Sequence, residues 1–156
     1  MEQKVLFKVH MPKSVDKPLL EILHSGFIGQ GKKVDEFEER LGEYFGNNKV
    51  LTLNSGTSGL HLALRLANVS YGDEVISTAM TCTATNMPIL AVGAKIVWAD
   101  VNPITGLIDP KSIEEKITSK TKAIIMVHFG GIPCDIDAIN IIAKKHNLKT
   151  IEDGAH

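Results

Sequence analysis

The sequence predicts an α/β fold in which a mostly parallel sheet is flanked by helices. From residue 49 onward, short apolar runs typical of strands alternate with segments of helical periodicity. These runs are continuously apolar, as in strands that helices cover on both faces. Hydrophobic residues make up 44% of the 156 residues, which is enough to build the core of such a domain.

Two helices are expected ahead of the sheet. Residues 15–25 carry three leucines and an isoleucine at helical spacing, and residues 34–45 place four apolar side chains on one face. The second helix should end at Gly46, because glycine commonly terminates helices. The stretch GFIGQGKK, residues 26–33, matches the start of a phosphate-binding loop but lacks the Ser or Thr that should follow the lysine. An exposed glycine turn is therefore favoured there.

The alternating part of the chain is assigned in order. Strands are expected at residues 49–54, 73–78, 94–101, 122–129 and in the last segment from 149. Between these strands, helices are expected at residues 83–92, 109–117 and 135–147. The helix at 109–117 begins with a capping Asp109 and with Pro110 at its first position.

The segment GTSGLHLALRLANV, residues 56–69, fits two patterns. Its leucines alternate as in a strand, yet leucines and alanines also form a helical face. No β-branched residue occurs from 59 to 68, which favours a helix. The cap-type residues Ser55 to Ser58 mark its start.

Composition excludes several classes of function. The net charge is −1 and no run of five like charges occurs, which gives little support to nucleic-acid or membrane-surface binding. No stretch approaches the roughly 20 apolar residues of a membrane span. Cys82 and Cys134 lie far apart without C-x-x-C spacing, so free thiols in a reducing compartment are expected. The start of the chain has no apolar core of secretory length, and the cytoplasm is the default location.

Ligands in open parallel sheets bind beyond the carboxyl ends of the strands. The segments at those ends should therefore gather on one rim, and they are 54–58, 78–82, Asp100, 128–131 and 153–156. The motif NSGTSG within the first segment offers free N–H groups and small residues at a helix start, which suit a phosphate. A plain helix cap that binds nothing is the alternative, and the motif alone leaves both open.

Asp153 follows an apolar strand, where a carboxylate can pair with the protonated ring nitrogen of pyridoxal phosphate. Taken alone, a turn or cap aspartate is the better interpretation. For His128, a turn histidine bonded to backbone is favoured, and for Cys134 an inert thiol. His156 has no companion at a metal-type spacing. Neither a G-x-G-x-x-G nor a G-x-S-x-G motif occurs.

Six motifs in order carry a family resemblance: SGTSGLHLAL, GDEVIST, GAKIVWADV, KTKAIIMVHFGG, CDIDAI and IEDGAH. Together they resemble the DegT/DnrJ/EryC1/StrS sugar aminotransferases, which are pyridoxal-phosphate enzymes of the aspartate-aminotransferase fold (fold type I). The resemblance runs from about residue 27 to 156. It implies an N-terminal helix and substrate-side loop at 1–33, and part of the cofactor-binding large domain at 34–156.

The resemblance also implies roles for individual residues. Gly56, Thr57 and Ser58 match the turn that binds the cofactor phosphate. Asp153 matches the partner of the pyridine nitrogen, and His156 matches the residue beside the phenolic oxygen of the ring. Cys82 stands where the family usually has an aromatic residue that stacks on the ring; a cysteine can contact the ring face but cannot stack.

The implied activity is transfer of an amino group, most often from glutamate, to a keto-sugar nucleotide. The Schiff-base lysine of the family lies a few dozen residues beyond the position of His156. We therefore expect this stretch to be an amino-terminal part that does not transaminate alone. Family enzymes are dimers, so a homo-oligomer is expected.

Three alternatives stay open on the sequence. One branch of the family dehydrates sugars at C3 with a histidine in place of the lysine. A non-catalytic, self-associating α/β fragment would leave sheet edges and apolar faces to be covered. A generic nucleotide-binding domain is weakened by the missing glycine fingerprint.

Overall fold

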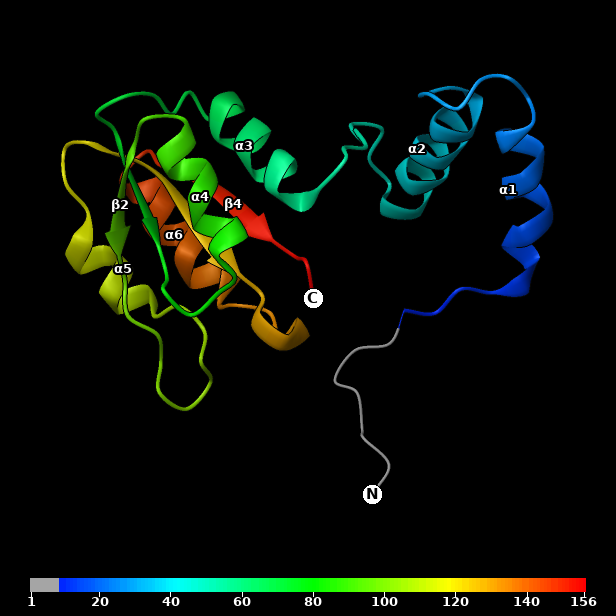
Figure 1. Ribbon diagram of the computed structural model, residues 1–156. Coiled ribbons are helices and arrows are strands. Elements are labelled where there is room, and N and C mark those ends of the chain that lie inside the picture. The colour runs from blue at the N-terminus through cyan, green and yellow to red at the C-terminus, as the bar shows by residue number, and fades with distance from the viewer. Residues whose placement is uncertain (1–8) are drawn as a thin grey trace. The chain divides into compact units, whose positions relative to one another are not determined.

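The computed structural model describes residues 9–156, which form two compact units with a boundary between Thr52 and Leu53 (Figure 1). The first eight residues of the expected N-terminal segment lie outside the described residues. The functional division expected between residues 33 and 34 stays a prediction. No helix within residues 9–156 combines the length and the apolar character that crossing a membrane requires.

The first unit contains the two expected helices. They are α1 (Asp16–Leu23), preceded by the 3-10 turn η1 (Lys13–Val15), and α2 (Lys32–Phe45). Gly46 adopts the left-handed conformation (φ 63°) and donates its N–H to the carbonyl of Glu43, which ends α2 where the sequence predicts. None of residues 9–52 is buried, and Leu19, Leu20 and Leu23 of α1 and Phe37 of α2 are each about half exposed.

The segment expected as a strand at 49–54 is irregular, and that prediction was wrong. A strand needs a neighbouring strand to take up its backbone groups, and none pairs with this segment among residues 9–156. Instead, the backbone N–H and the hydroxyl of Thr52 both donate to Oε1 of Glu38, each at 2.7 Å. Leu51 is 60% exposed, so burial of its apolar side chain contributes little to the stability of this segment.

Acid should release Thr52 from Glu38. The N–H of Thr52, and then its hydroxyl, lower the pKa of Glu38 from its ordinary value of 4.5. A carboxylate with a lowered pKa holds its donors fully above the ordinary value and loses them as the pH falls through the lowered one. We expect the amide ¹H shift of Thr52 to titrate only below about pH 4.5, which NMR can follow. Glu38→Gln should abolish the titration, and a transition centred above that pH would contradict the assignment.

The second unit is built on four parallel strands in the order β2-β1-β3-β4, which confirms the predicted fold class. The strands are β1 (Glu74–Ser77), β2 (Lys95–Trp98), β3 (Thr121–Val127) and β4 (Lys149–Asp153). The helices are α3 (Gly56–Leu66), α4 (Thr83–Ala91), α5 (Pro110–Lys116) and α6 (Ile136–Lys145), with the short 3-10 turn η2 (Phe129–Gly131) after β3. Each lies within a residue or a few of its predicted position.

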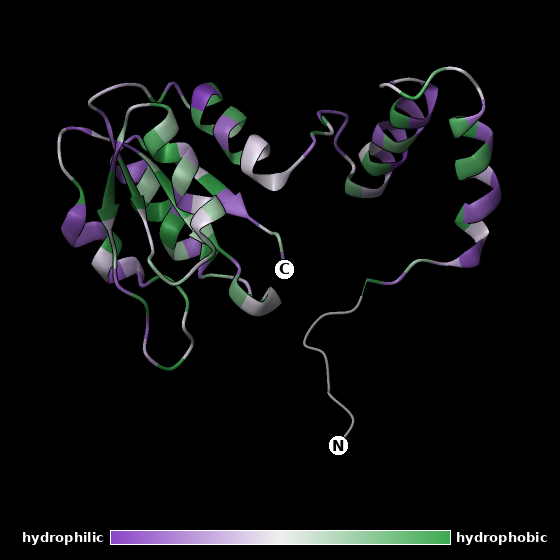
Figure 2. Cartoon of the chain, viewed as in Figure 1, coloured by the Kyte–Doolittle hydropathy of each residue, from purple (hydrophilic) through white to green (hydrophobic). Residues whose placement is uncertain are grey.

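Helices cover both faces of this sheet, as the continuous apolar runs predict. In β3, Ala123 and Ile125 face a core cluster that contains α3 and α4, whereas Ile124 and Met126 face the cluster that contains α5 and α6. All four side chains are fully buried. Figure 2 shows the hydrophobic colour concentrated on the strands and on the adjoining sides of the helices.

The ambiguous segment 56–69 contains the helix α3. Leu60 and Leu64 are buried, whereas Leu66 is 74% exposed. This burial follows the spacing of four residues in a helix and not the alternation of a strand. The amino-acid composition of the segment therefore correctly predicted a helix.

Candidate functional site

Asp153 ends β4, and Cys82 and His156 come after β1 and β4, whereas Gly56, Thr57 and Ser58 begin α3, which no strand of the described residues directly precedes. Because every strand pair is parallel, the carboxyl ends of the strands lie along one edge of the sheet. In Figure 1, β4 points toward the side on which α3 begins, and α3 contacts β4. The start of α3 and the end of β4 therefore face the same side of the unit.

Asp153 is the last residue of β4 and is half-buried. Its Oδ2 accepts a hydrogen bond from the Thr85 hydroxyl at 2.7 Å, and its Oδ1 accepts from the N–H of Ala155 at 3.2 Å. Its backbone carbonyl accepts from the N–H of His128 at 3.1 Å, which extends the ladder one residue beyond β3. The carboxylate is thus held by the side chain of Thr85 and by the backbone N–H of Ala155 in the turn that follows β4.

Thr85 and its neighbour Asn86 were not predicted as site residues. Asn86 is buried; its Oδ1 accepts from the Ser77 hydroxyl at 2.6 Å, and its Nδ2 donates to the Thr78 carbonyl at 3.0 Å. The first turns of α4 are therefore fastened to the carboxyl end of β1. The available signal was the adjacent polar pair Thr85 and Asn86 within the mostly apolar helix TATNMPILA, where a buried polar group needs a partner.

His156 is joined to the loop that follows β3. Its Nδ1 accepts from the N–H of Gly130 at 3.0 Å, and the ring of Phe129 lies edge-on to it, with centroids 5.6 Å apart. Because Nδ1 accepts, the neutral ring carries its proton on Nε2. Gly130 (φ 64°) and Gly131 (φ 79°) both adopt the left-handed conformation that favours glycine, so the motif HFGG shapes this loop.

His128 and Cys134 form a structural pair beside that loop. Nδ1 of His128 accepts from the N–H of Cys134 at 3.2 Å, so Nε2 carries the proton toward Oε2 of Glu152 at 2.9 Å. The Cys134 thiol is buried and donates to the carbonyl of Val127 at 3.1 Å. These contacts fit the predicted roles of a turn histidine bonded to backbone and an inert thiol.

The two cysteines should differ sharply in reactivity. Cys82 is exposed, whereas Cys134 is buried, and burial raises the pKa of the Cys134 thiol above its ordinary value of 9.0. Since the thiolate is the reacting form, iodoacetamide should modify Cys134 at least about tenfold more slowly than Cys82 at neutral pH. Peptide mass spectrometry over time measures both rates. Cys82→Ser should remove the fast reaction, and equal rates in the folded protein would contradict this assignment.

The start of α3 has the donors that a phosphate needs. Oγ of Ser55 accepts from the N–H of Ser58 at 3.2 Å, while the Ser55 hydroxyl donates to Oγ of Ser58 at 3.0 Å. In that contact the Ser58 hydroxyl is the acceptor, so its own proton remains available to a ligand. Within residues 9–156, the N–H groups of Gly56 and Thr57 meet no acceptor, as expected in the first turn of a helix. A Cβ at Gly56 would meet nothing within 4 Å, so space for a ligand stays open there.

Two predicted rim residues are less tightly placed. Cys82 directly precedes α4, with its side chain exposed, and no hydrogen bond joins it to Asp153. Asp100 is exposed, and its N–H donates to the Ser112 hydroxyl at 2.9 Å on the side of α5. The structure thus joins Asp153 to α4 and His156 to the HFGG loop, but it ties neither Cys82 nor Asp100 to them.

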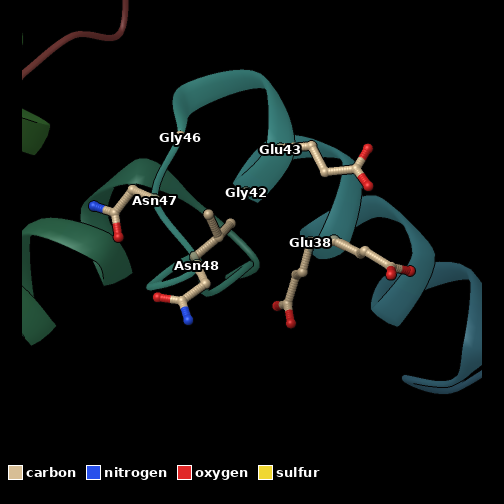
Figure 3. A pocket seen from close by; sticks show the side chains of 8 residues that line it. Glu38, Gly42, Glu43, Gly46, Asn47 and Asn48 are labelled. Carbon is tan, nitrogen blue, oxygen red and sulfur yellow. The ribbon is translucent and has the colours of Figure 1, made fainter.

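A separate hollow of about 610 Å³ lies in the first unit, at the C-terminal end of α2. Figure 3 shows the side chains around it, among them Glu38, Glu43, Asn47 and Asn48. Carboxylates and a helix C-terminus both repel anions. A phosphate or a carboxylate substrate is therefore disfavoured there, and the hollow takes no part in the candidate site.

The fold of the chain is shared with a sugar aminotransferase, CalS13 from Micromonospora echinospora, which matches with a TM-score of 0.89 and 36% identity, over 95% of this chain and 42% of that one. Two further solved structures match as well. AtS13 from Actinomadura melliaura matches with a TM-score of 0.94 and 42% identity, over 100% of this chain and 44% of that one. NtdA from Bacillus subtilis, solved with its bound cofactor PMP (pyridoxamine phosphate), matches with a TM-score of 0.85 and 38% identity, over 88% of this chain and 32% of that one.

The family itself follows from the sequence match. The model of the DegT/DnrJ/EryC1/StrS aminotransferase family matches residues 10–156, and the chain belongs to this family. A relative, the dTDP-3-amino-3,6-dideoxy-alpha-D-galactopyranose transaminase of Aneurinibacillus thermoaerophilus, is 42% identical over 143 residues, which are 92% of this chain and 39% of that protein. The chain thus spans about two fifths of this relative's length.

Proposed function

We propose that this chain forms the cofactor-binding side of an aminotransferase that moves an amino group, from glutamate, to a keto-sugar nucleotide. The observation that carries the proposal is Asp153, a strand-end carboxylate held on both oxygens at the edge where α3 presents free phosphate donors. The Aneurinibacillus relative, a transaminase of a dTDP-linked amino sugar, supports a sugar nucleotide as the acceptor class. Because the chain spans 39% of that relative, the activity is proposed for the whole protein.

The described residues fit pyridoxal phosphate. The N–H groups of Gly56 and Thr57, with the hydroxyls of Thr57 and Ser58, would hold its phosphate at the positive end of α3. When bound, the cofactor supplies a protonated pyridine ring that withdraws electrons from the reacting carbon. Asp153 would accept a hydrogen bond from the protonated ring nitrogen. Two of its four lone-pair positions stay free after Thr85 and Ala155 have donated to it.

His156 and Cys82 would complete the surroundings of the ring. The Nε2–H of His156, set by the bond from Gly130, can donate to an oxygen on the ring. Cys82 would contact a ring face without the stacking that an aromatic side chain provides. Within residues 9–156, no lysine hydrogen-bonds to Asp153, Thr85 or His156, so these residues bind and orient but do not supply the amine that holds the cofactor covalently.

The direct test is amino transfer by the protein as its gene encodes it. Glutamate and a dTDP-linked keto-hexose would be supplied with pyridoxal phosphate, and the products analysed by mass spectrometry. We expect an amino-sugar nucleotide and 2-oxoglutarate. A deoxygenated keto-sugar formed without consumption of glutamate would instead support the dehydratase branch, and no change in either sugar would reject both activities.

The position of Cys82 can be tested without catalysis. Pyridoxamine 5′-phosphate lacks the aldehyde, so it does not react with thiols or lysines, and it should slow alkylation of Cys82 by at least about tenfold when it saturates the site. Inorganic phosphate alone should protect far less, because it fills only the α3 end of the site. Unchanged alkylation at saturating pyridoxamine phosphate would remove Cys82 from the cofactor site.

We also propose that the protein is a homo-oligomer. Met87 and Leu90 of α4 and Trp98 of the edge strand β2 are about half exposed, and they surround one apolar hollow. A second copy of the chain would remove this surface from water. Light scattering at several concentrations measures the mass, and a monomer at all concentrations would contradict the proposal.

A further inference from the structure

We propose that Thr85, backed by Thr81, is the positioning residue that aims Asp153 at the ring nitrogen of the cofactor. This inference rests on the proposed function, because it assigns a role toward the same cofactor. It adds two hydroxyl groups to the site that neither the family match nor the sequence motifs single out.

The direction of the hydrogen bonds is fixed by counting protons. A threonine hydroxyl has one proton, and an ionised carboxylate has none to give. The Thr85 hydroxyl therefore donates to Oδ2 of Asp153, at 2.7 Å. The contact between the hydroxyls of Thr81 and Thr85, also 2.7 Å, must then run from Thr81 to Thr85. The result is a one-way chain from Thr81 through Thr85 to Asp153.

The chain of donors is rigid at its centre. Thr85 is 1% exposed and lies in α4, where a β-branched side chain has few rotamers. The next residue, Asn86, fastens the same turn to Ser77 and to the Thr78 carbonyl. The Thr85 hydroxyl therefore holds a fixed position relative to the sheet, although it comes from 68 residues before Asp153 in the sequence.

This fixed donor matters because Asp153 is at the end of its strand. The last carboxylate of a strand, followed by an irregular segment, would otherwise be free to rotate. With Oδ2 bonded to Thr85 and Oδ1 to Ala155, both oxygens of the carboxylate are held, and each keeps a lone pair for a further donor. Pre-orientation of this kind lowers the entropic cost of pairing with a ligand.

The test measures binding and does not require turnover. The probes are pyridoxamine 5′-phosphate and its analogue in which the ring nitrogen is replaced by C–H, titrated calorimetrically into the protein as its gene encodes it. The unaltered protein should prefer the nitrogen-containing ring. Thr85→Val, which replaces the hydroxyl with a methyl of similar size, should reduce that preference by about tenfold. Thr85→Ser should retain most of it.

The matched control is Thr83→Val, which removes an exposed hydroxyl from the same helix and should leave the preference unchanged. A purely structural Thr85 would lower the melting temperature of the Val variant and leave the preference intact, which would overturn the inference. If Thr85→Val does not fold, Thr81→Val carries the test, since it removes the partly buried hydroxyl behind Thr85 and should weaken the preference in the same direction.

Failure of the proposed function gives a different result. If the unaltered protein binds both rings equally, Asp153 does not pair with a ring nitrogen, and both proposals fall. If it prefers the nitrogen-containing ring and the Thr85→Val and Thr81→Val variants keep that preference in full, the proposed function stands and the positioning role of Thr85 is wrong.

Discussion

Replacing Asp153 with asparagine should lower amino transfer by about a hundredfold to a thousandfold, as the loss of a preorganised charge typically does. The amide is nearly isosteric and its oxygen can still accept from Thr85, so the fold should persist. It cannot balance a positive charge on the ring nitrogen, which is the role proposed for the carboxylate. The measurement is kcat/KM for glutamate, with circular dichroism to verify that the variant folds.

The matched control for this substitution is Asp137→Asn. Asp137 is an exposed acidic residue in the first turn of α6, on a different element and without a proposed role. The activity of the Asp137→Asn variant should stay within about twofold of that of the unaltered protein. An Asp153→Asn variant that is equally active would show that the ring nitrogen has another partner or that the cofactor binds elsewhere.

The second large effect concerns stability. Ile124→Ala should lower the free energy of unfolding by about 2–5 kcal/mol, through lost burial and through the cavity that remains. Ile124 is fully buried in β3, the strand that pairs with both β1 and β4, and it contacts the core on the side of α5 and α6. Relaxation around it is limited because the strands on both sides hold its backbone. Urea denaturation measures the change.

Ile141→Ala is the control for the core substitution. Ile141 lies in α6 but is 69% exposed, so truncating it should change the free energy of unfolding by less than about 0.5 kcal/mol. If Ile124→Ala were equally mild, the centre of the sheet would be far less tightly packed than its burial indicates.

The success and failure of the sequence predictions have a physical explanation. Helices and buried strands were predicted because periodicity and side-chain type act locally, as in α3, where leucines and alanines without β-branched neighbours favour a helix. The segment 49–54 failed because a strand depends on a partner that its own residues do not reveal. Its apolar side chains satisfied the pattern, but its Thr52 N–H bonds to Glu38.

The site shows the same division. The pattern of strands and helices could predict the rim segments that contain Gly56 to Ser58, Asp153 and His156, but the roles of these residues came from the family resemblance and stay predictions. Thr85 could not be predicted, because its partner lies 68 residues away and the sequence does not show which strand α4 crosses. The contact between His156 and Gly130 likewise depends on two loops that come together only in the folded sheet.

The strand order has a consequence for synthesis on the ribosome. The strands appear in the order β1, β2, β3, β4, while the sheet has the order β2-β1-β3-β4. A growing chain can pair β2 with β1, then add β3 to the free edge of β1, and add β4 only to an existing β3. Asp153 ends β4, whereas the hydroxyl that holds it is made 68 residues earlier. Translation must therefore deliver the last of these strands before the carboxylate can reach Thr85, so the pairing proposed between this aspartate and the cofactor has to wait for β4.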